Sequence, residues 1–131
     1  MEPDVRCPCG SGLSYGECCR PIHLGLSPAQ SAERLMRSRF SAFAVGDPAY
    51  LLRSWHPRTR PSTLELDTDT RWLWLEIVRT ERGAEHDTDG VVEFRAKYRV
   101  DAPAGRSSGV QHEVSTLTRV DGAWVYVDGA A

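Results

Sequence analysis

Four cysteines crowded into the first nineteen residues constrain this chain more than any other feature. They are Cys7, Cys9, Cys18 and Cys19, and no cysteine follows them. Cysteines spread along a chain suggest core thiols or a disulfide framework, whereas a tight cluster indicates a metal knuckle. Four thiolates can surround Zn²⁺ tetrahedrally at about 2.3 Å, and the dication keeps them deprotonated. We therefore predict one structural zinc ion held by these four side chains.

The sequence favours metal binding by the cysteines over a disulfide or a redox-active pair. A disulfide pair is disfavoured in a reducing cytosol, and a redox-active pair more often has the spacing Cys-x-x-Cys. The fourth ligand position is open to two candidates. Cys18 and Cys19 are sequence neighbours, so binding one ion with both sulfurs demands a particular local backbone, and His23 competes with Cys19 for that place.

The composition fits one small domain with an appendage. The 131 residues are 40% hydrophobic and 26% charged, an ordinary globular balance. The sequence has no run of about 18 apolar residues, which is the length that a membrane-spanning helix needs, and no apolar signal segment precedes the cysteines. We therefore expect a cytoplasmic protein.

The net charge of −2 argues against a dedicated nucleic-acid binder. We expect a zinc knuckle over residues 1–26 and a second domain over residues 27–131.

Helical periodicity begins after the appendage. Ser27 and Pro28 resemble a helix cap and first-turn proline, and apolar residues then recur every three or four positions up to Gly46, which suits a helix end. Arg39 lies beside this apolar stripe, so we expect it to reach a buried carboxylate or to anchor the knuckle. Asp47 and Pro48 predict a second helix over 48–55.

The hydrophobic period changes to two from residue 71 onwards. Strands are predicted over 72–80, 92–100, 110–120 and 124–127, with loops over 83–90 and 102–109 and a tight turn at 121–122. On the first strand, Leu73 and Leu75 are expected on one face, and Trp72 and Trp74 on the other. Helices followed by hairpin-linked strands predict an α+β domain, with the helices on one face of a curved antiparallel sheet.

Particular segments carry a family resemblance. The run from Cys7 to Cys19, CPCGSGLSYGECC, resembles the SEC-C motif, a zinc knuckle also found in the preprotein-translocase ATPase, where it contributes to partner binding. The segments 35–43, 50–57 and 122–129 resemble the bacterial YchJ family. The resemblance implies a SEC-C knuckle followed by a cone-shaped nuclear transport factor two-like (cystatin-like) domain with a cavity at its open end. It implies no particular reaction.

Polar residues near the implied cavity are candidates for ligand contact. The candidates for a polar pocket are His56, Arg60, Tyr98, His112, Glu113 and Tyr126. His112 shares strand parity with Val110 and Val114, so it is expected to face inward, with Glu113 facing the other way. His56, His112 and Tyr98 are weak candidates for acid–base catalysis.

Three functions remain open at this stage. The first is a zinc-containing module that binds a protein partner through the knuckle or a small ligand in the cone. The second is an enzyme of isomerase, dehydratase or hydrolase type that uses the cavity. The third is a structural domain that forms a homodimer. A closed four-thiolate site has no open position for water, so its metal is expected to be structural.

Overall fold

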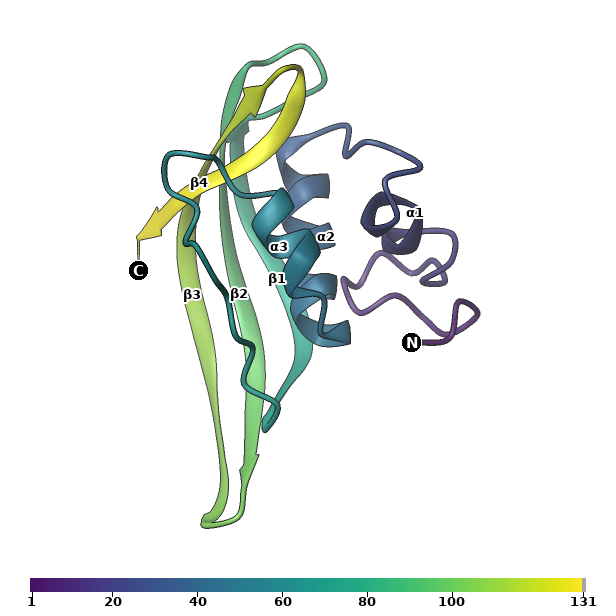
Figure 1. Ribbon diagram of the computed structural model, residues 1–131, viewed down its shortest axis with the longest axis vertical. Helices are drawn as coiled ribbons and strands as arrows, with labels where there is room; N and C mark the ends of the chain where they lie inside the picture. The colour runs from purple at the N-terminus through teal and green to yellow at the C-terminus, as the bar shows by residue number, and fades with distance from the viewer. Residues whose placement is uncertain (131) are drawn as a thin grey trace.

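A computed structural model describes residues 1–130, and Ala131, the end of the predicted second domain, lies outside the described residues. The elements are α1 (Cys19–His23), α2 (Ala32–Val45), α3 (Pro48–Arg53), β1 (Thr70–Arg82), β2 (Asp89–Ala102), β3 (Gly105–Val120) and β4 (Ala123–Ala130). The strands form one antiparallel sheet in the order β1-β2-β3-β4. Helices α2 and α3 cover one face of this curved sheet, and α1 with the N-terminal segment lies beyond α2 (Figure 1). The predicted α+β fold is confirmed.

Helix α2 begins later than the sequence pattern suggested. Its N-cap is Ser31, whose side chain accepts a hydrogen bond from the backbone N–H of Arg34 at 3.1 Å. The cap predicted at Ser27 is wrong, because the chain before α2 is held differently: the N–H of Ala32 donates to the carbonyl of Gly83 at 2.9 Å. The predicted end at Gly46 is confirmed, with a φ of 79°.

The main core lies between α2 and the inner face of the sheet. It joins the apolar stripe of α2 to inward-facing residues of β2, β3 and β4; its largest members are Leu35, Met36, Phe40, Val92, Phe94, Leu117 and Trp124. Burying each such side chain contributes about 1.5 to 3 kcal/mol relative to exposure. Within residues 1–130, no helix is long and apolar enough to cross a membrane.

A β-bulge at Leu73 changes the faces of β1. Trp72 pairs with Tyr98 and Trp74 pairs with Lys97, so Leu73 has no partner in the ladder. The extra residue reverses the alternation, and Trp72 joins Leu75 against the core. Leu73 and Trp74 are 46% and 44% exposed. The predicted grouping of Leu73 with Leu75 is therefore wrong.

The hairpin between β2 and β3 is longer than predicted. The residues expected to form a loop over 102–109 largely continue the strands, with Val100 paired to Ser107 and Ala102 paired to Gly105. The Asp101 carboxylate accepts hydrogen bonds from the guanidinium groups of Arg99 and Arg106 and holds the tip together. The hairpin extends past the helices in Figure 1.

Candidate metal centre and ligand cavity

The four cysteine sulfurs meet in one buried cluster. The Sγ atoms of Cys7, Cys9, Cys18 and Cys19 all lie within 4.8 Å of one another. Turns fold the chain around them: the N–H of Cys7 donates to the carbonyl of Leu13 at 2.9 Å, and Cys19 opens α1. None of the four is bridged by a disulfide.

The donor set and its spacing fit a tetrahedral metal. Four sulfurs at about 2.3 Å from one ion would lie about 3.8 Å apart. The Sγ of Cys18 lies 3.6 Å from that of Cys9 and 3.9 Å from that of Cys19. Burial raises the pKa of the Cys18 thiol, so a cation is needed to favour thiolate there. The cluster can therefore hold one ion with no position left open.

Helix α2 contacts the sulfur cluster with one polar face. The Arg34 guanidinium donates hydrogen bonds to the Sγ atoms of Cys18 at 3.0 Å and Cys19 at 3.4 Å. Arg37 donates to the backbone carbonyl of Cys9 at 2.6 Å, and the Ser41 hydroxyl lies 3.4 Å from the Cys7 Sγ. These contacts place a positive charge beside the sulfurs and attach the N-terminal segment to the domain.

His23 lies outside the cluster. Its Nδ1 lies 2.7 Å from the Tyr15 hydroxyl, and its Nε2 lies 2.8 Å from the carbonyl of Ser38. Both ring nitrogens are therefore engaged, and burial lowers the pKa of the imidazole below 6.5. His23 links the knuckle to α2, so it does not replace Cys19 in the sulfur cluster.

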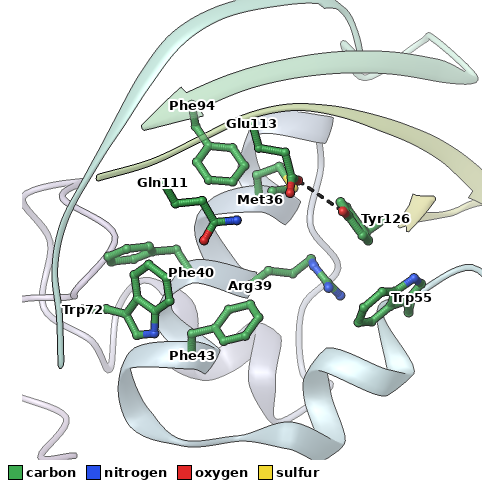
Figure 2. A pocket seen from close by; sticks show the side chains of 10 residues that line it. All are labelled: Met36, Arg39, Phe40, Phe43, Trp55, Trp72, Phe94, Gln111, Glu113 and Tyr126. Carbon is green, nitrogen blue, oxygen red and sulfur yellow. Dashed lines mark hydrogen bonds between the residues drawn. The ribbon is translucent and has the colours of Figure 1, made fainter. Parts of the chain in front are cut away.

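A cavity of about 210 Å³ lies between α2 and the inner face of the sheet. Side chains from α2, from the segment after α3 and from all four strands line it (Figure 2). They are Met36, Arg39, Phe40, Phe43, Trp55, Trp72, Phe94, Gln111, Glu113 and Tyr126. The wall is mostly aromatic, with one cationic and one acidic side chain.

Arg39 is the cationic group, and it is only 3% exposed. Its Nη1 donates to the carbonyl of Leu51 at 2.8 Å and to the Ser54 hydroxyl at 2.7 Å. The guanidinium carbon lies 5.0 Å from the ring centroid of Trp55 and 4.5 Å from that of Tyr126. Burial lowers the pKa of Arg39 to about 10, so the group is charged at neutral pH. Within residues 1–130, Arg39 therefore pairs with no carboxylate, and its hydrogen bonds go to Leu51 and Ser54 rather than to the knuckle.

Glu113 is the acidic group of the cavity. One carboxylate oxygen, Oε2, accepts hydrogen bonds from the hydroxyls of Ser115 and Tyr126, the latter at 3.1 Å. Gly129 makes room for this side chain, because a Cβ at that position would overlap the Glu113 carboxylate. Burial, Glu113 and the hydrogen bond raise the pKa of Tyr126, so its hydroxyl stays protonated and donates.

Most of the residues predicted to line a pocket lie outside the cavity. Glu113 and Tyr126 line the cavity, whereas His56, Arg60, Tyr98 and His112 are not among its lining residues. The inward orientation expected for His112 is wrong: its Nε2 contacts Glu93, and its side chain is 40% exposed. His56 accepts the Arg58 N–H, and the Arg60 guanidinium donates to the Trp55 carbonyl. The three weak catalytic candidates therefore do not meet in one site.

Sequence reasoning missed Gln111 at the cavity and the polar face of α2 that contacts the cysteine cluster. Gln111 lines the cavity beside the predicted Glu113 because the odd-numbered residues of β3 face inward, whereas Val110 and Val114 had suggested that the even-numbered residues do. Arg34, Arg37 and Ser41 lie three and four positions apart. That spacing places them on one helix face, which was a readable signal for contact with the knuckle.

Comparisons with family models match both parts of the chain. The SEC-C motif model matches residues 6–21, and the model described as "YchJ, middle NTF2-like domain" matches residues 31–129. A UPF0225 protein of Streptomyces coelicolor is 52% identical over 127 residues, 97% of this chain and 96% of that relative. A UPF0225 protein of Chromobacterium violaceum is 48% identical over 128 residues, 95% of this chain and 92% of the relative.

Two solved structures have a similar architecture. The solution structure of a SEC-C motif containing protein from Rhodopseudomonas palustris aligns with a TM-score of 0.80 and 30% identity, over 95% of this chain and 97% of that one. The crystal structure of a SEC-C motif containing protein from Psychrobacter arcticus aligns with a TM-score of 0.72 and 28% identity, over 98% of this chain and 84% of that one.

Proposed function

Since the chain belongs to the UPF0225 family and joins a SEC-C motif to a YchJ-type NTF2-like domain, we propose that it is a zinc-stabilised ligand-binding module. In this proposal the cavity between α2 and the sheet takes a small molecule. The four cysteines hold one Zn²⁺ that fastens the N-terminal segment to α2. The observation that carries ligand binding is a cavity of about 210 Å³ with a buried arginine in its wall.

The zinc ion has a structural role in this proposal. Cys7, Cys9, Cys18 and Cys19 would fill all four positions of a tetrahedral ion, so no water molecule is activated there. When bound, the ion supplies folding free energy to a segment whose own buried cluster consists of these cysteines and Tyr15. Thiolate ligands need a reducing compartment, so we propose that the protein works in the cytoplasm.

Binding is proposed in preference to catalysis. His56 and His112, the expected acid–base residues, do not line the cavity. The polar groups that do line it include Arg39 and Glu113, which suit recognition of a ligand by charge. An enzyme that uses the cavity would have to work without the histidines.

Ligand binding can be tested by NMR on the indole N–H resonances, because two of the four tryptophans lie at the cavity and two lie away from it. Trp55 and Trp72 line the cavity, whereas Trp74 and Trp124 do not. A mixture of small aromatic fragments added to ¹⁵N-labelled protein should shift the indole N–H signals of Trp55 and Trp72 and leave the other two in place. Shifts spread equally over all four signals, or none at all, would contradict the proposal.

A matched pair of variants locates the binding. Gln111 points into the cavity in Figure 2, and its neighbour Val110 is exposed at 48%. Adding a large ring with Gln111→Tyr should abolish the fragment shifts, whereas Val110→Tyr should preserve them. Equal binding by the two variants would place the fragments elsewhere.

Protein binding by the knuckle is a second candidate function. Several large apolar side chains of residues 1–26 are exposed, namely Met1, Val5, Leu13, Leu24 and Leu26. Exposed apolar side chains are typical of contact surfaces when they gather. The test is quantitative cross-linking in cells: Leu13→Gln with Leu26→Gln should remove any specific partner while fragment binding persists. A partner retained by this double variant would argue against the knuckle as the contact.

A further inference from the structure

Two opposite charges line one cavity without pairing with each other. Arg39 and Glu113 both line it, yet the ion pairs of residues 1–130 include none between them. Figure 2 shows Arg39 entering from the helix side and Glu113 from the sheet side. The space between an unpaired cation and an unpaired anion is suited to a ligand that carries both opposite charges.

Each charged group keeps hydrogen-bonding capacity for a ligand. The protein hydrogen bonds of the Arg39 guanidinium all come from Nη1, and the Nη2 and Nε donors have no partner within residues 1–130. In Glu113, both hydroxyl contacts go to Oε2, which leaves Oε1 as a free acceptor. The two hydroxyls donate to Glu113, which is the arrangement that an ionised carboxylate requires.

The charges select against singly charged ligands. An anion that pairs with Arg39 would also face the Glu113 carboxylate, and a cation that pairs with Glu113 would face the guanidinium. Both repulsions are strengthened in a site of low dielectric constant. A neutral molecule would leave two desolvated charges without partners. A zwitterion satisfies both groups at once.

The remaining wall selects an apolar body of limited size. Phe40, Phe43 and Trp72 form an aromatic side of the cavity in Figure 2. The volume of about 210 Å³ is below the roughly 300 to 1,000 Å³ of sites for drug-sized ligands. Nucleotides and large cofactors are therefore too big, whereas a free amino acid is of suitable size.

We propose that the cavity binds a small zwitterion with an apolar side chain, of the α-amino acid class. Its carboxylate would accept hydrogen bonds from Arg39, its ammonium group would donate to Glu113 Oε1, and its side chain would pack on the aromatic wall. This inference rests on the proposed function, because it names the ligand class of the same cavity.

The test compares four probes that share a phenyl ring. They are L-phenylalanine, 3-phenylpropanoate without the ammonium group, 2-phenylethylamine without the carboxylate, and neutral 2-phenylethanol. Each is titrated into the full chain, and the indole signals of Trp55 and Trp72 report binding. Phenylalanine should bind at least roughly tenfold more tightly than the other three, since each of them lacks a charged partner for Arg39, for Glu113 or for both.

A substitution that removes one charge gives a second readout. Glu113→Gln keeps an acceptor for the Tyr126 hydroxyl but removes the negative charge, so the preference should move from phenylalanine to 3-phenylpropanoate. Glu76→Gln removes the same charge at a side chain that is 54% exposed and pairs with Arg95, and it should change nothing. The buried Arg39 is left intact, so that folding is preserved.

The outcomes separate the two proposals. Tightest binding of phenylalanine, with the preference moved by Glu113→Gln, supports the zwitterion. Tightest binding of a singly charged or neutral probe overturns the zwitterion and leaves ligand binding in place. If neither these probes nor the fragment mixture shift the signals of Trp55 and Trp72, both proposals fail.

Discussion

The guanidinium of Arg34 lies 3.0 Å from the sulfur of Cys18, close enough for a charge-assisted hydrogen bond to a thiolate. A zinc ion with four thiolates carries a net charge of −2, and one adjacent arginine offsets part of that charge. Such outer contacts orient the ligands of a metal and tune its affinity. Arg34 therefore ties the N-terminal segment to α2 through the sulfurs themselves.

Replacing Arg34 should weaken metal binding. We expect Arg34→Gln to lower the zinc affinity by about 10- to 100-fold, because the thiolates lose a charged donor. Competition with a chromophoric chelator measures this change. Arg58→Gln, at an exposed loop position with no side-chain hydrogen bond in the described chain, is the matched control. Equal affinities in the two variants would show that Arg34 does not act on the metal.

Replacing a core leucine should cost far more stability than replacing an exposed one. Leu117 is fully buried between α2 and the sheet, whereas Leu73 is 46% exposed at the bulge. Leu117→Ala should lower the free energy of unfolding by about 2 to 5 kcal/mol, and Leu73→Ala by about 0.5 kcal/mol or less. Denaturant unfolding of the zinc-loaded protein measures both. A large loss at Leu73 would contradict the bulge.

The stability contribution of His23 should fall in acid. Burial lowers the pKa of the folded imidazole below 6.5, so the unfolded chain takes up a proton first as the pH drops. The contribution is present above about pH 6.5 and is lost progressively as the pH falls below it. His23→Gln cannot titrate, and its stability relative to the parent protein should rise between pH 7.5 and 5.5. A stability difference between His23→Gln and the parent protein that stays constant across that range would contradict a lowered pKa for the folded His23 imidazole.

Gly129 should be needed for the position of Glu113. A Cβ at residue 129 would overlap the Glu113 carboxylate, so Gly129→Ala should displace it from the Tyr126 hydroxyl. We expect ligand affinity in the cavity to fall while the overall fold is retained. Gly122→Ala is not a suitable comparison, because its φ of 84° adds backbone strain. Gly129→Ser should repeat the effect of alanine, and unchanged binding in both variants would contradict the packing.

The order of helices and strands could be predicted from hydrophobic periodicity and from residues typical of caps and turns, but most of the residues that line the cavity could not. The α2 end at Gly46, the α3 cap at Asp47 and four antiparallel strands were readable from local chemistry. The inward face of β3 was not, because Val110 and Val114 made the outer face appear apolar. The bulge at Leu73 adds one residue to β1, and nothing local in the sequence marks it.

The cysteine cluster itself could be predicted from the sequence, unlike the cavity, but its fourth member could not. Clustering within nineteen residues predicted that the sulfurs would meet, and their separations fit one tetrahedral ion. The choice between Cys19 and His23 could not be made from spacing. It depends on Tyr15 and the Ser38 carbonyl, which occupy both nitrogens of His23 and come from two different parts of the chain.

The central claim is that one zinc ion holds the N-terminal segment in place, and metal analysis tests it most directly. The protein, purified under reducing conditions without chelator, is digested and its metals are quantified against protein concentration. We expect about one equivalent of zinc per chain, reduced to near zero in a variant with Cys9→Ser and Cys18→Ser. A wild-type content below roughly half an equivalent, with residues 1–26 still folded, would contradict the account.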